Sequence, residues 1–176
     1  MSMHSTAGVI FLSLLCLSFT SIAVEEQDQL PGRALTSEET LHLNSHVFPN
    51  GEGLPEGTGT ISDGRIVYDS HCAACHGQRG EGASAVELIG DRELLNTEFP
   101  DKGIGVYWPY APTLFEYIKR AMPPDNPGSF TPQQLYSVTG YVLYLNDLLP
   151  ENTSVNSKTL TEIVMPNRDG FTNKYP

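Results

Sequence analysis

Cys72, Cys75 and His76 are the residues whose types and spacing could do chemistry. They stand in the stretch YDSHCAACHGQRGEG, with only Ala73 and Ala74 between the two thiols. This C-x-x-C-H pattern is typical of covalent haem attachment. One helical turn presents two thiols to the two vinyl groups of a porphyrin, and the next residue turns its imidazole to the iron. The motif therefore predicts one covalently bound haem c, with His76 as the proximal iron ligand.

The same two cysteines allow other interpretations. A redox dithiol of the thioredoxin kind would need a strand–helix–strand context, and the surrounding sequence shows none. A zinc site would need two further ligands at suitable spacing, and His71 is the one additional donor nearby. A structural disulfide here would close a very small loop and contribute little stability. Haem attachment is therefore the preferred interpretation.

The iron of such a haem needs a second axial ligand or an open position. Met122 in RAMPPDNPGSF and Met165 in VMPNRDGF are the candidates after His76, and each precedes a proline. We expect Met122, because a loop between two packed helices holds a thioether more rigidly than a tail does, with Met165 as the second choice. Ligation by histidine and methionine raises the haem potential relative to two nitrogen ligands. The site is therefore expected to relay electrons rather than activate oxygen.

Histidines are weaker candidates for the distal position. None follows the motif, and the four before it are His4, His42, His46 and His71. His71 is tied to the attachment helix and can hardly reach the opposite face of a haem. His42 and His46 have the i, i+4 spacing of a solvated helix end.

The first 23 residues have the layout of a cleavable export signal. The apolar run Val9–Phe19 is followed by small residues ending at Ala23, and it is too short to span a membrane as a helix, which needs about 20 apolar residues. A retained membrane anchor is the alternative, since no Lys or Arg precedes the run. Cys16 would leave with the signal, and Leu15 before it does not favour lipid attachment. We expect a periplasmic protein, cleaved near Ala23, with no membrane span when mature.

Composition bounds the remaining possibilities. The chain has 176 residues, 39% of them hydrophobic, and a formal net charge of −11. Such a chain suits one compact domain, and its acidity argues against nucleic acid or an anionic membrane as a partner. No nucleotide-binding glycine loop, nucleophile triad or pair of catalytic carboxylates can be assembled from a clear motif, so no catalytic residue is predicted.

The chain is expected to divide into four parts: a signal (1–23), an extended arm (24–60), an all-α domain (61–149) and a polar, extended tail (150–176) that packs on the domain or on a partner. Within the arm, TSEE predicts a short helix from Thr36 with a capping box to Glu39. The first helix of the domain is expected to start near Asp63 as its N-cap. The stretch 86–95 is expected to form a helical turn or two, and 96–112 to be irregular.

Two further helices carry the clearest signals. Thr113–Ala121 is expected to open with a capping box of Thr113 and Glu116, and Thr131–Asp147 with one of Thr131 and Gln134. The apolar residues left for a core are few, so a buried porphyrin should fill the middle. The residues expected to pack on it, or equally to form ordinary core, are Leu88, Leu94, Trp108, Leu114, Ile118 and Leu135.

Several longer blocks of the sequence resemble a known family: FPNGEGLPEGTG, CAACHGQRGEG, GIGVYWPYAPTLFEYIKRAMPPDNPGSF, YVLYLNDLLPE and VMPNRDGF. They resemble class I cytochromes c and, more specifically, the cytochrome subunit of Sox-type sulfane (sulfite) dehydrogenases. The likeness covers Val47 to Phe171. It implies a class I cytochrome c fold, with an extended N-terminal arm and a C-terminal tail.

The resemblance also implies partners and residue roles. The chain would accept electrons from a molybdenum-cofactor subunit that oxidises sulfur, and would pass them to a small soluble cytochrome. Cys72 and Cys75 would form the thioethers, His76 would be the proximal ligand and Met122 the distal one, while MPNRDGF keeps Met165 as ligand or marks a segment wrapped on the partner. The chain departs from the family in two ways: it has a single haem motif, and no proline after it to accept the imidazole N–H.

Three functions remain open from sequence. The first is the electron-transfer subunit of a molybdenum sulfur dehydrogenase. The second is a free diffusible carrier without a permanent partner. The third, least favoured, is a haem catalyst with an open iron site. The long arm and tail, and the aromatic residues Tyr107, Trp108 and Tyr110, favour the first because they could form an interface.

Overall fold

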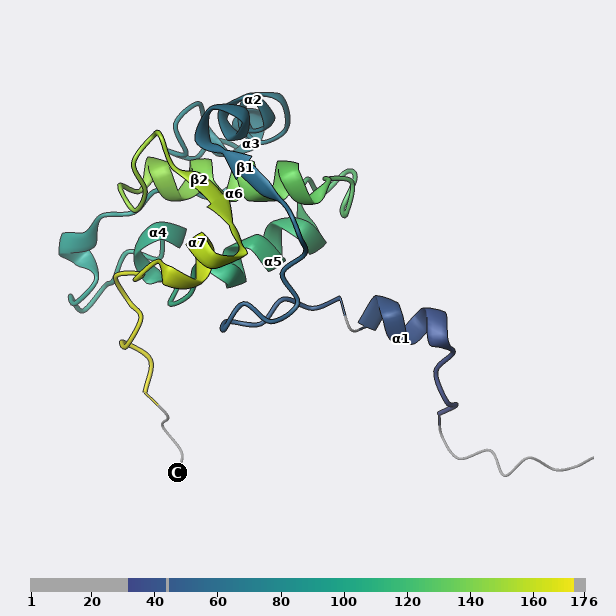
Figure 1. Cartoon of the computed structure of the whole chain (residues 1–176). Helices are drawn as coiled ribbons and strands as arrows, with labels where there is room; N and C mark the ends of the chain where they lie inside the picture. Colours follow the sequence, from purple (N-terminus) through teal and green to yellow (C-terminus); the bar gives the residue numbers. More distant parts are fainter. Residues whose placement is uncertain (1–31, 44, 173–176) are drawn as a thin grey trace, which may run out of the picture. The chain divides into compact units, whose positions relative to one another are not determined.

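The computed structural model describes residues 32–43 and 45–172 (Figure 1). One compact unit begins at Thr36, and the described residues before it belong to a separate unit. The predicted signal, with Cys16 and His4, lies outside the described residues, as does the side chain of His42. Among the described helices, none has the length and apolar character needed to cross a membrane.

Helices are the main regular structure of the compact unit, as expected. In chain order the elements are α1 (Ser37–Leu43), β1 (Thr58–Thr60), α2 (Ile61–His71), α3 (Ala73–His76), the 3-10 helix η1 (Arg92–Leu94), α4 (Ile104–Tyr107), α5 (Ala111–Ala121), α6 (Pro132–Leu145), β2 (Ser154–Asn156) and α7 (Ser157–Glu162). The short α4 falls in the stretch expected to be irregular. Within residues 86–95, where a helical turn or two was expected, the structure has the single 3-10 turn η1.

The packing of α2 on α6 is the main contact of the fold (Figure 1). Gly64 lets the two helices approach, because a Cβ added there would lie 2.0 Å from the carbonyl oxygen of Ser137. Further along, the rings of Tyr68 and Tyr141 pack with their centroids 5.2 Å apart. This close crossing fixes the direction of α2, and α2 ends at the first cysteine of the motif.

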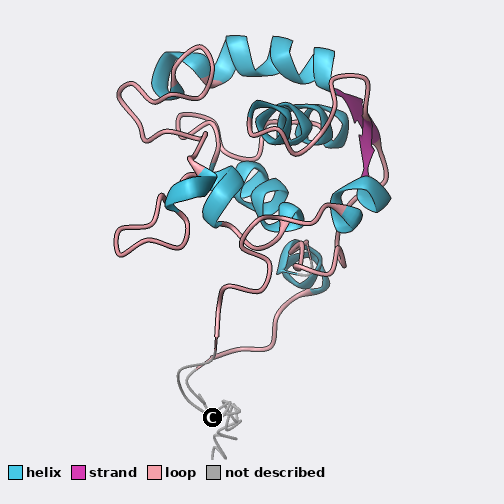
Figure 2. Ribbon diagram, turned by 90° about the vertical axis from the view of Figure 1, so that its left-hand side faces the viewer, coloured by secondary structure: helices cyan, strands magenta, loops and turns pink. Residues whose placement is uncertain are grey.

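A two-stranded antiparallel sheet corrects the all-α prediction. Thr58 pairs with Asn156 and Thr60 with Ser154, and Figure 2 shows both strands at one edge of the unit. Each strand has three residues, too few to give an alternating pattern in the sequence. Val155 of β2 is fully buried against α6, where its Cγ2 lies 2.6 Å from the position of a Cβ on Gly140. The sheet joins the end of the arm to the tail.

The tail is more structured than the sequence suggested. It was expected to be polar and extended and to pack on the domain or on a partner; the structure adds the regular elements β2 and α7, and the tail contributes buried apolar side chains to the core. These are Val155, Leu160, Ile163 and Met165. Their spacing is irregular, so no helical or strand period marks them in the sequence.

The helix starts were predicted with mixed success. The boxes of Thr36 with Glu39 and of Thr131 with Gln134 are confirmed. The N-cap of α2 is Thr60 rather than Asp63, and its hydroxyl accepts the Asp63 N–H at 3.1 Å.

The predicted box at the start of α5 is wrong. This helix starts at Ala111 after Tyr110, which makes no side-chain cap. Glu116 instead accepts the backbone N–H of Val47 at 3.0 Å and so fastens the arm to the helix. The sequence could not show this because the donor is a backbone group 69 positions away.

Candidate haem-binding site

One cavity of about 600 Å³ brings the predicted residues together. Its volume falls within the roughly 300–1,000 Å³ of small-molecule sites. The lining residues are His71, Cys72, Cys75, His76, Ala85, Val86, Glu87, Leu88, Lys102, Ile104, Trp108, Leu114, Tyr117, Ile118, Met122, Pro123, Pro124, Val138 and Val142. Helices α5 and α6, α4 and the motif thus all contribute to its wall, and most of the lining is apolar.

The motif forms one helical turn at the edge of this cavity. Cys72 ends α2 and also precedes α3, which consists of Ala73–His76. The backbone N–H groups of Cys75 and His76 both donate to the Cys72 carbonyl, at 3.0 and 2.9 Å. Both cysteines are free thiols. The chain then turns away at Gly77, whose φ of 83° suits glycine.

His76 is oriented by a backbone carbonyl. Its Nδ1 lies 2.8 Å from the carbonyl oxygen of Val86. Because a carbonyl can only accept, Nδ1 carries the proton, and Nε2 keeps its lone pair for a metal. The sequence left this partner unidentified because the expected proline is missing. A backbone acceptor leaves no mark in the residue type, so Val86 could not be found from sequence.

Met122 lies at the end of α5 on the cavity wall. It is the C-cap residue in an extended conformation, with its N–H donating to the Ile118 carbonyl at 3.0 Å. Pro123 and Pro124 continue the wall. Helix α5 is tied to the arm by the Glu116 contact and by Lys119, which donates to the Ser45 carbonyl. Met122 therefore stands at the end of a helix that two side chains tie to the arm.

Met165 does not line the cavity. Its side chain is 1% exposed and belongs to the hydrophobic core. The segment that follows packs on the chain's own domain, where Asn167 Nδ2 donates to the Tyr107 carbonyl at 2.7 Å. Two of the blocks of sequence that carried the resemblance, those containing GIGVYWPYAP and MPNRDGF, thus contact each other.

Comparisons with known proteins agree with this geometry. Residues 59–142 match the family described as cytochrome C oxidase, cbb3-type, subunit III. The structure is similar to a chain of the crystal structure of the sulfane dehydrogenase SoxCD from Paracoccus pantotrophus, with 34% identity and a TM-score of 0.74. The match covers 80% of this chain and 70% of that chain. The chain belongs to the cytochrome c family. It is an electron-transfer protein of the cytochrome c type, similar to that dehydrogenase.

The cavity of this cytochrome fits a haem. Two free thiols one turn apart, an imidazole with Nε2 available and a thioether on another element make up a donor set suited to a c-type haem. The apolar lining suits a porphyrin, which would lose little hydrogen bonding on burial. The residues present therefore match the group that the family implies.

The acidity of the Cys72 thiol argues against Cys72 as the attacking thiol of a redox dithiol in the cytochrome. Burial, and to a smaller extent the neighbouring Cys75, raises the pKa of the Cys72 thiol to about 11. A thiol with so high a pKa is rarely a thiolate at neutral pH and is a poor nucleophile in disulfide exchange. Within residues 32–43 and 45–172, no group of three or more His, Cys, Asp and Glu side chains could hold a metal ion, although a zinc site would need such a group.

Four of the six apolar residues expected around the haem line the cavity: Leu88, Trp108, Leu114 and Ile118. Leu94 is 44% exposed, and Leu135 is buried in the core outside the lining. Among the residues that sequence reasoning missed are Val138 and Val142 of α6. Both belong to an apolar stripe of that helix, formed with Leu135 and Leu145 at spacings of three and four residues, and this stripe could have pointed to them.

His71 and His46, both weak candidates for the distal ligand, lie in different surroundings. His71 lines the cavity, with its ring edge-on to Phe130 at a centroid distance of 5.2 Å. It precedes Cys72 directly, so it lies on the same side as the motif. His46 lies outside the lining residues, and its Nδ1 is 3.4 Å from Glu116.

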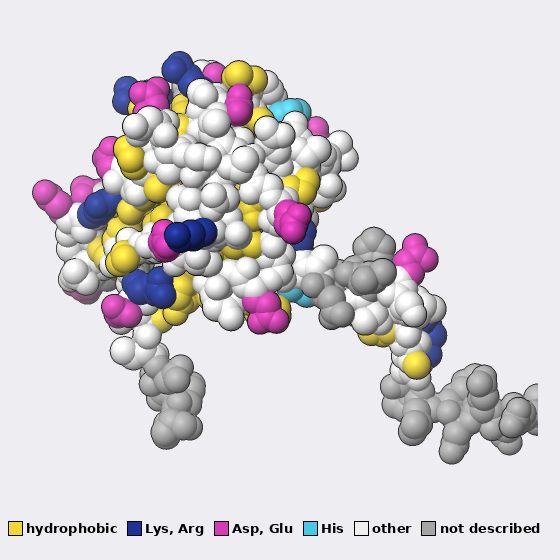
Figure 3. Space-filling view, viewed as in Figure 1, with side chains coloured by type: hydrophobic (Ala, Val, Ile, Leu, Met, Phe, Trp, Pro, Cys, Tyr) yellow, Lys and Arg dark blue, Asp and Glu magenta, His cyan; other side chains and the backbone are white. Residues whose placement is uncertain are grey.

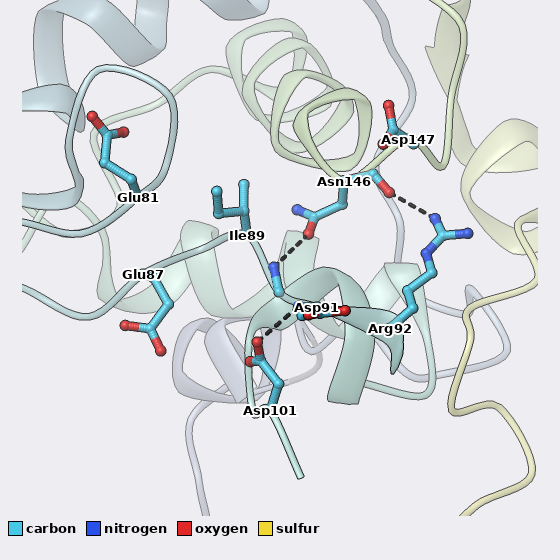
Figure 4. A pocket seen from close by; sticks show the side chains of 9 residues that line it. Glu81, Glu87, Ile89, Asp91, Arg92, Asp101, Asn146 and Asp147 are labelled. Atoms are coloured by element: carbon cyan, nitrogen blue, oxygen red, sulfur yellow. Dashed lines mark hydrogen bonds between the residues drawn. The ribbon is translucent and has the colours of Figure 1, made fainter. Parts of the chain in front are cut away.

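An acidic hollow adjoins the cavity (Figure 4). Glu87 lines both, and the other acidic residues of the hollow are Glu81, Asp91, Asp101 and Asp147. Asn146 braces this region, because its Oδ1 accepts the Gly90 N–H at 3.2 Å and its Nδ2 donates to the Leu88 carbonyl at 3.1 Å. By contrast, the face shown in Figure 3 intersperses acidic, basic and hydrophobic side chains.

Proposed function

We propose that this cytochrome is the monohaem electron-transfer subunit of a periplasmic sulfur dehydrogenase. It accepts electrons from a molybdenum-cofactor subunit that oxidises sulfane sulfur or sulfite, and passes them to a soluble cytochrome. The observation that carries the proposal is one cavity with two cysteines and a histidine on one element and a methionine on another. That cavity occurs in a chain 34% identical to a chain of a sulfane dehydrogenase.

In this proposal each donor has one role. Cys72 and Cys75 hold the haem through thioether bonds, formed by adding each thiol S–H across one vinyl group. His76 ligates the iron through Nε2, oriented by the Val86 carbonyl, and Met122 ligates it from the end of α5. The bound haem supplies reversible one-electron oxidation. Ligation by histidine and methionine keeps the potential higher than two nitrogen ligands would.

The cavity rim offers partners an approach. Cys75 is exposed, the Val86 side chain is 72% exposed and Tyr117 is 45% exposed, and all three line the cavity. Electron transfer requires the redox centre to come close to a partner without direct chemistry. An exposed rim with apolar side chains suits such a contact, since interface cores favour aromatic and apolar groups.

A free diffusible carrier is the second candidate, and the tail favours it. The long tail was a reason to expect an interface, but its described part packs on the domain's own core through Val155, Leu160 and Met165. A tail used in this way does not need a partner to cover it.

Copurification from the native host tests the proposal. Affinity purification under mild conditions, through a tag on the C-terminus, should also isolate a second protein that contains molybdenum. The sample should show the absorption of a c-type haem. The Cys72→Ser/Cys75→Ser variant is the control for haem-dependent assembly. Migration of the haem-loaded cytochrome alone, with no molybdenum, would support the diffusible carrier and reject the subunit proposal.

A further inference from the structure

Residues 165–171, here called the C-terminal clasp, pack against the end of α4. Asn167 Nδ2 donates to the carbonyl oxygen of Tyr107 at 2.7 Å. The ring of Phe171 meets the ring of Tyr107 edge-on, with a centroid distance of 5.3 Å. The clasp therefore contacts both the backbone and the side chain of the last residue of α4.

Trp108 stands between two contacts of the clasp. On its other side, Arg168 places its guanidinium 4.9 Å from the ring centroid of Tyr110. Trp108 itself lines the cavity and meets the ring of Tyr117 edge-on at 5.6 Å. The clasp thus holds the backbone just before Trp108, at the Tyr107 carbonyl, and the side chain of Tyr110 just after it.

Asn167 is the central residue of the clasp. It is 9% exposed, so the hydrogen bond from its side-chain amide to the Tyr107 carbonyl is shielded from water. Its own carbonyl accepts the Gly170 N–H at 3.2 Å, which closes a turn around the amide. A Cβ added at Gly170 would lie 1.7 Å from Asn167 Oδ1. The Asn167 side-chain amide therefore fits inside this turn because position 170 carries no side chain.

We propose that Asn167 is a positioning residue for the haem site. By holding the Tyr107 carbonyl it fixes the orientation of the Trp108 indole and so keeps water out of the cavity. The inference rests on the proposed haem occupancy of the cavity. A drier haem environment disfavours the extra positive charge of the oxidised iron and raises the potential. Loosening Trp108 would therefore lower the potential while leaving the covalent attachment intact.

The Asn167→Ala variant tests this in the haem-loaded protein. Trp108 is the single tryptophan of the sequence, so its near-ultraviolet circular dichroism can be isolated by subtracting the spectrum of Trp108→Phe. We expect Asn167→Ala to lose most of the Trp108 dichroism and to shift the reduction potential downward, with the haem content unchanged. Asn152→Ala is the matched control, because Asn152 is an exposed tail residue of the same type.

Gly170→Ala disturbs the same amide without touching Asn167. Gly170 is exposed and its φ lies outside the left-handed region, so the variant should fold and should shift both readouts in the same direction. If Asn167→Ala yields no loaded protein, Gly170→Ala decides alone. Dichroism and potential equal to those of Asn152→Ala would overturn the proposal, even if the melting temperature fell. A wild-type protein without haem would instead refute the haem assignment.

Discussion

Met122 and Met165 are each followed by a proline, but their surroundings differ. Met122 ends a helix, is half-buried and lines the cavity. Met165 follows α7, is 1% exposed and packs in the core. The dipeptide alone therefore does not mark a ligand. The two methionines differ in the element that carries them. The end of α5 forms part of the cavity wall, whereas the segment after α7 packs in the core.

The two segments are also anchored differently. The helix that carries Met122 is tied to the arm by Glu116 and Lys119. The segment that carries Met165 is tied to α4 by Asn167. In the proposed function, the ties of α5 to the arm hold the iron ligand Met122, and the tie of Asn167 to α4 holds the cavity wall at Trp108. The variants below separate these two roles.

Removing both thiols should have the largest effect, because the haem would then have no covalent attachment to the chain. In Cys72→Ser/Cys75→Ser we expect complete loss of haem that resists acid extraction, measured by the absorption of the extracted protein. Ser70→Ala, an exposed change on the same helix, should keep the full haem content. Extraction-resistant haem in the double variant would contradict the assignment.

Met122→Leu should keep the haem and lose its distal ligand. The absorption band of methionine bound to ferric iron, toward the red end of the oxidised spectrum, should disappear, and the reduction potential should fall. Because the swap conserves volume, its packing cost should stay below about 1.5 kcal/mol. A band that survives Met122→Leu but vanishes in a Met165 variant would reverse the roles given to the two methionines.

Met165→Ala should lower stability and leave the site intact. Truncating a fully buried methionine leaves a cavity and typically costs about 2–5 kcal/mol. Denaturant unfolding of the loaded protein measures this loss, and the methionine-to-iron band should persist. Val164→Ala is the matched control, because Val164 is 75% exposed and should change stability by less than about 0.5 kcal/mol. An equal loss in both variants would place Met165 outside the core.

Glu116→Ala should have the smallest effect on the site. It leaves the Val47 N–H without its side-chain acceptor, and an unsatisfied buried donor costs about 1–3 kcal/mol. Protease cleavage within the arm should become faster, while the haem spectrum stays the same. Glu162→Ala, which removes an exposed pair with Lys158, should leave the cleavage rate unchanged. A changed haem spectrum in Glu116→Ala would show that the arm helps to hold Met122.

The site was easier to predict than the rest of the fold because its signals are local. Cys72, Cys75 and His76 are adjacent in sequence, and Met122 is marked by a helix end and two prolines. The structure places all four on one cavity. The Val86 carbonyl acts through its backbone and has no signature in the sequence.

The sheet and the clasp were missed for a different reason. Strands β1 and β2 have three residues each and pair across the length of the domain, so neither shows a period. The tail was expected to pack on the domain or on a partner, but nothing in the residue type of Asn167 shows that its side chain is buried, and only its contact with Tyr107 reveals this. Non-local contacts of single residues are set by the tertiary fold, which propensity and periodicity do not encode.

The pairing of Thr58 with Asn156 also sets the order in which the chain can fold. Residues 61–153 lie between the two strands, so the loop they form closes only after the tail has been synthesised. The helix that ends at Cys72 likewise waits for α6 to provide its packing surface. Until then the thiols of the motif are not enclosed by the finished domain. In the proposed function, a haem could therefore be attached while the chain is still open, and the last segment of the chain would close the domain around it.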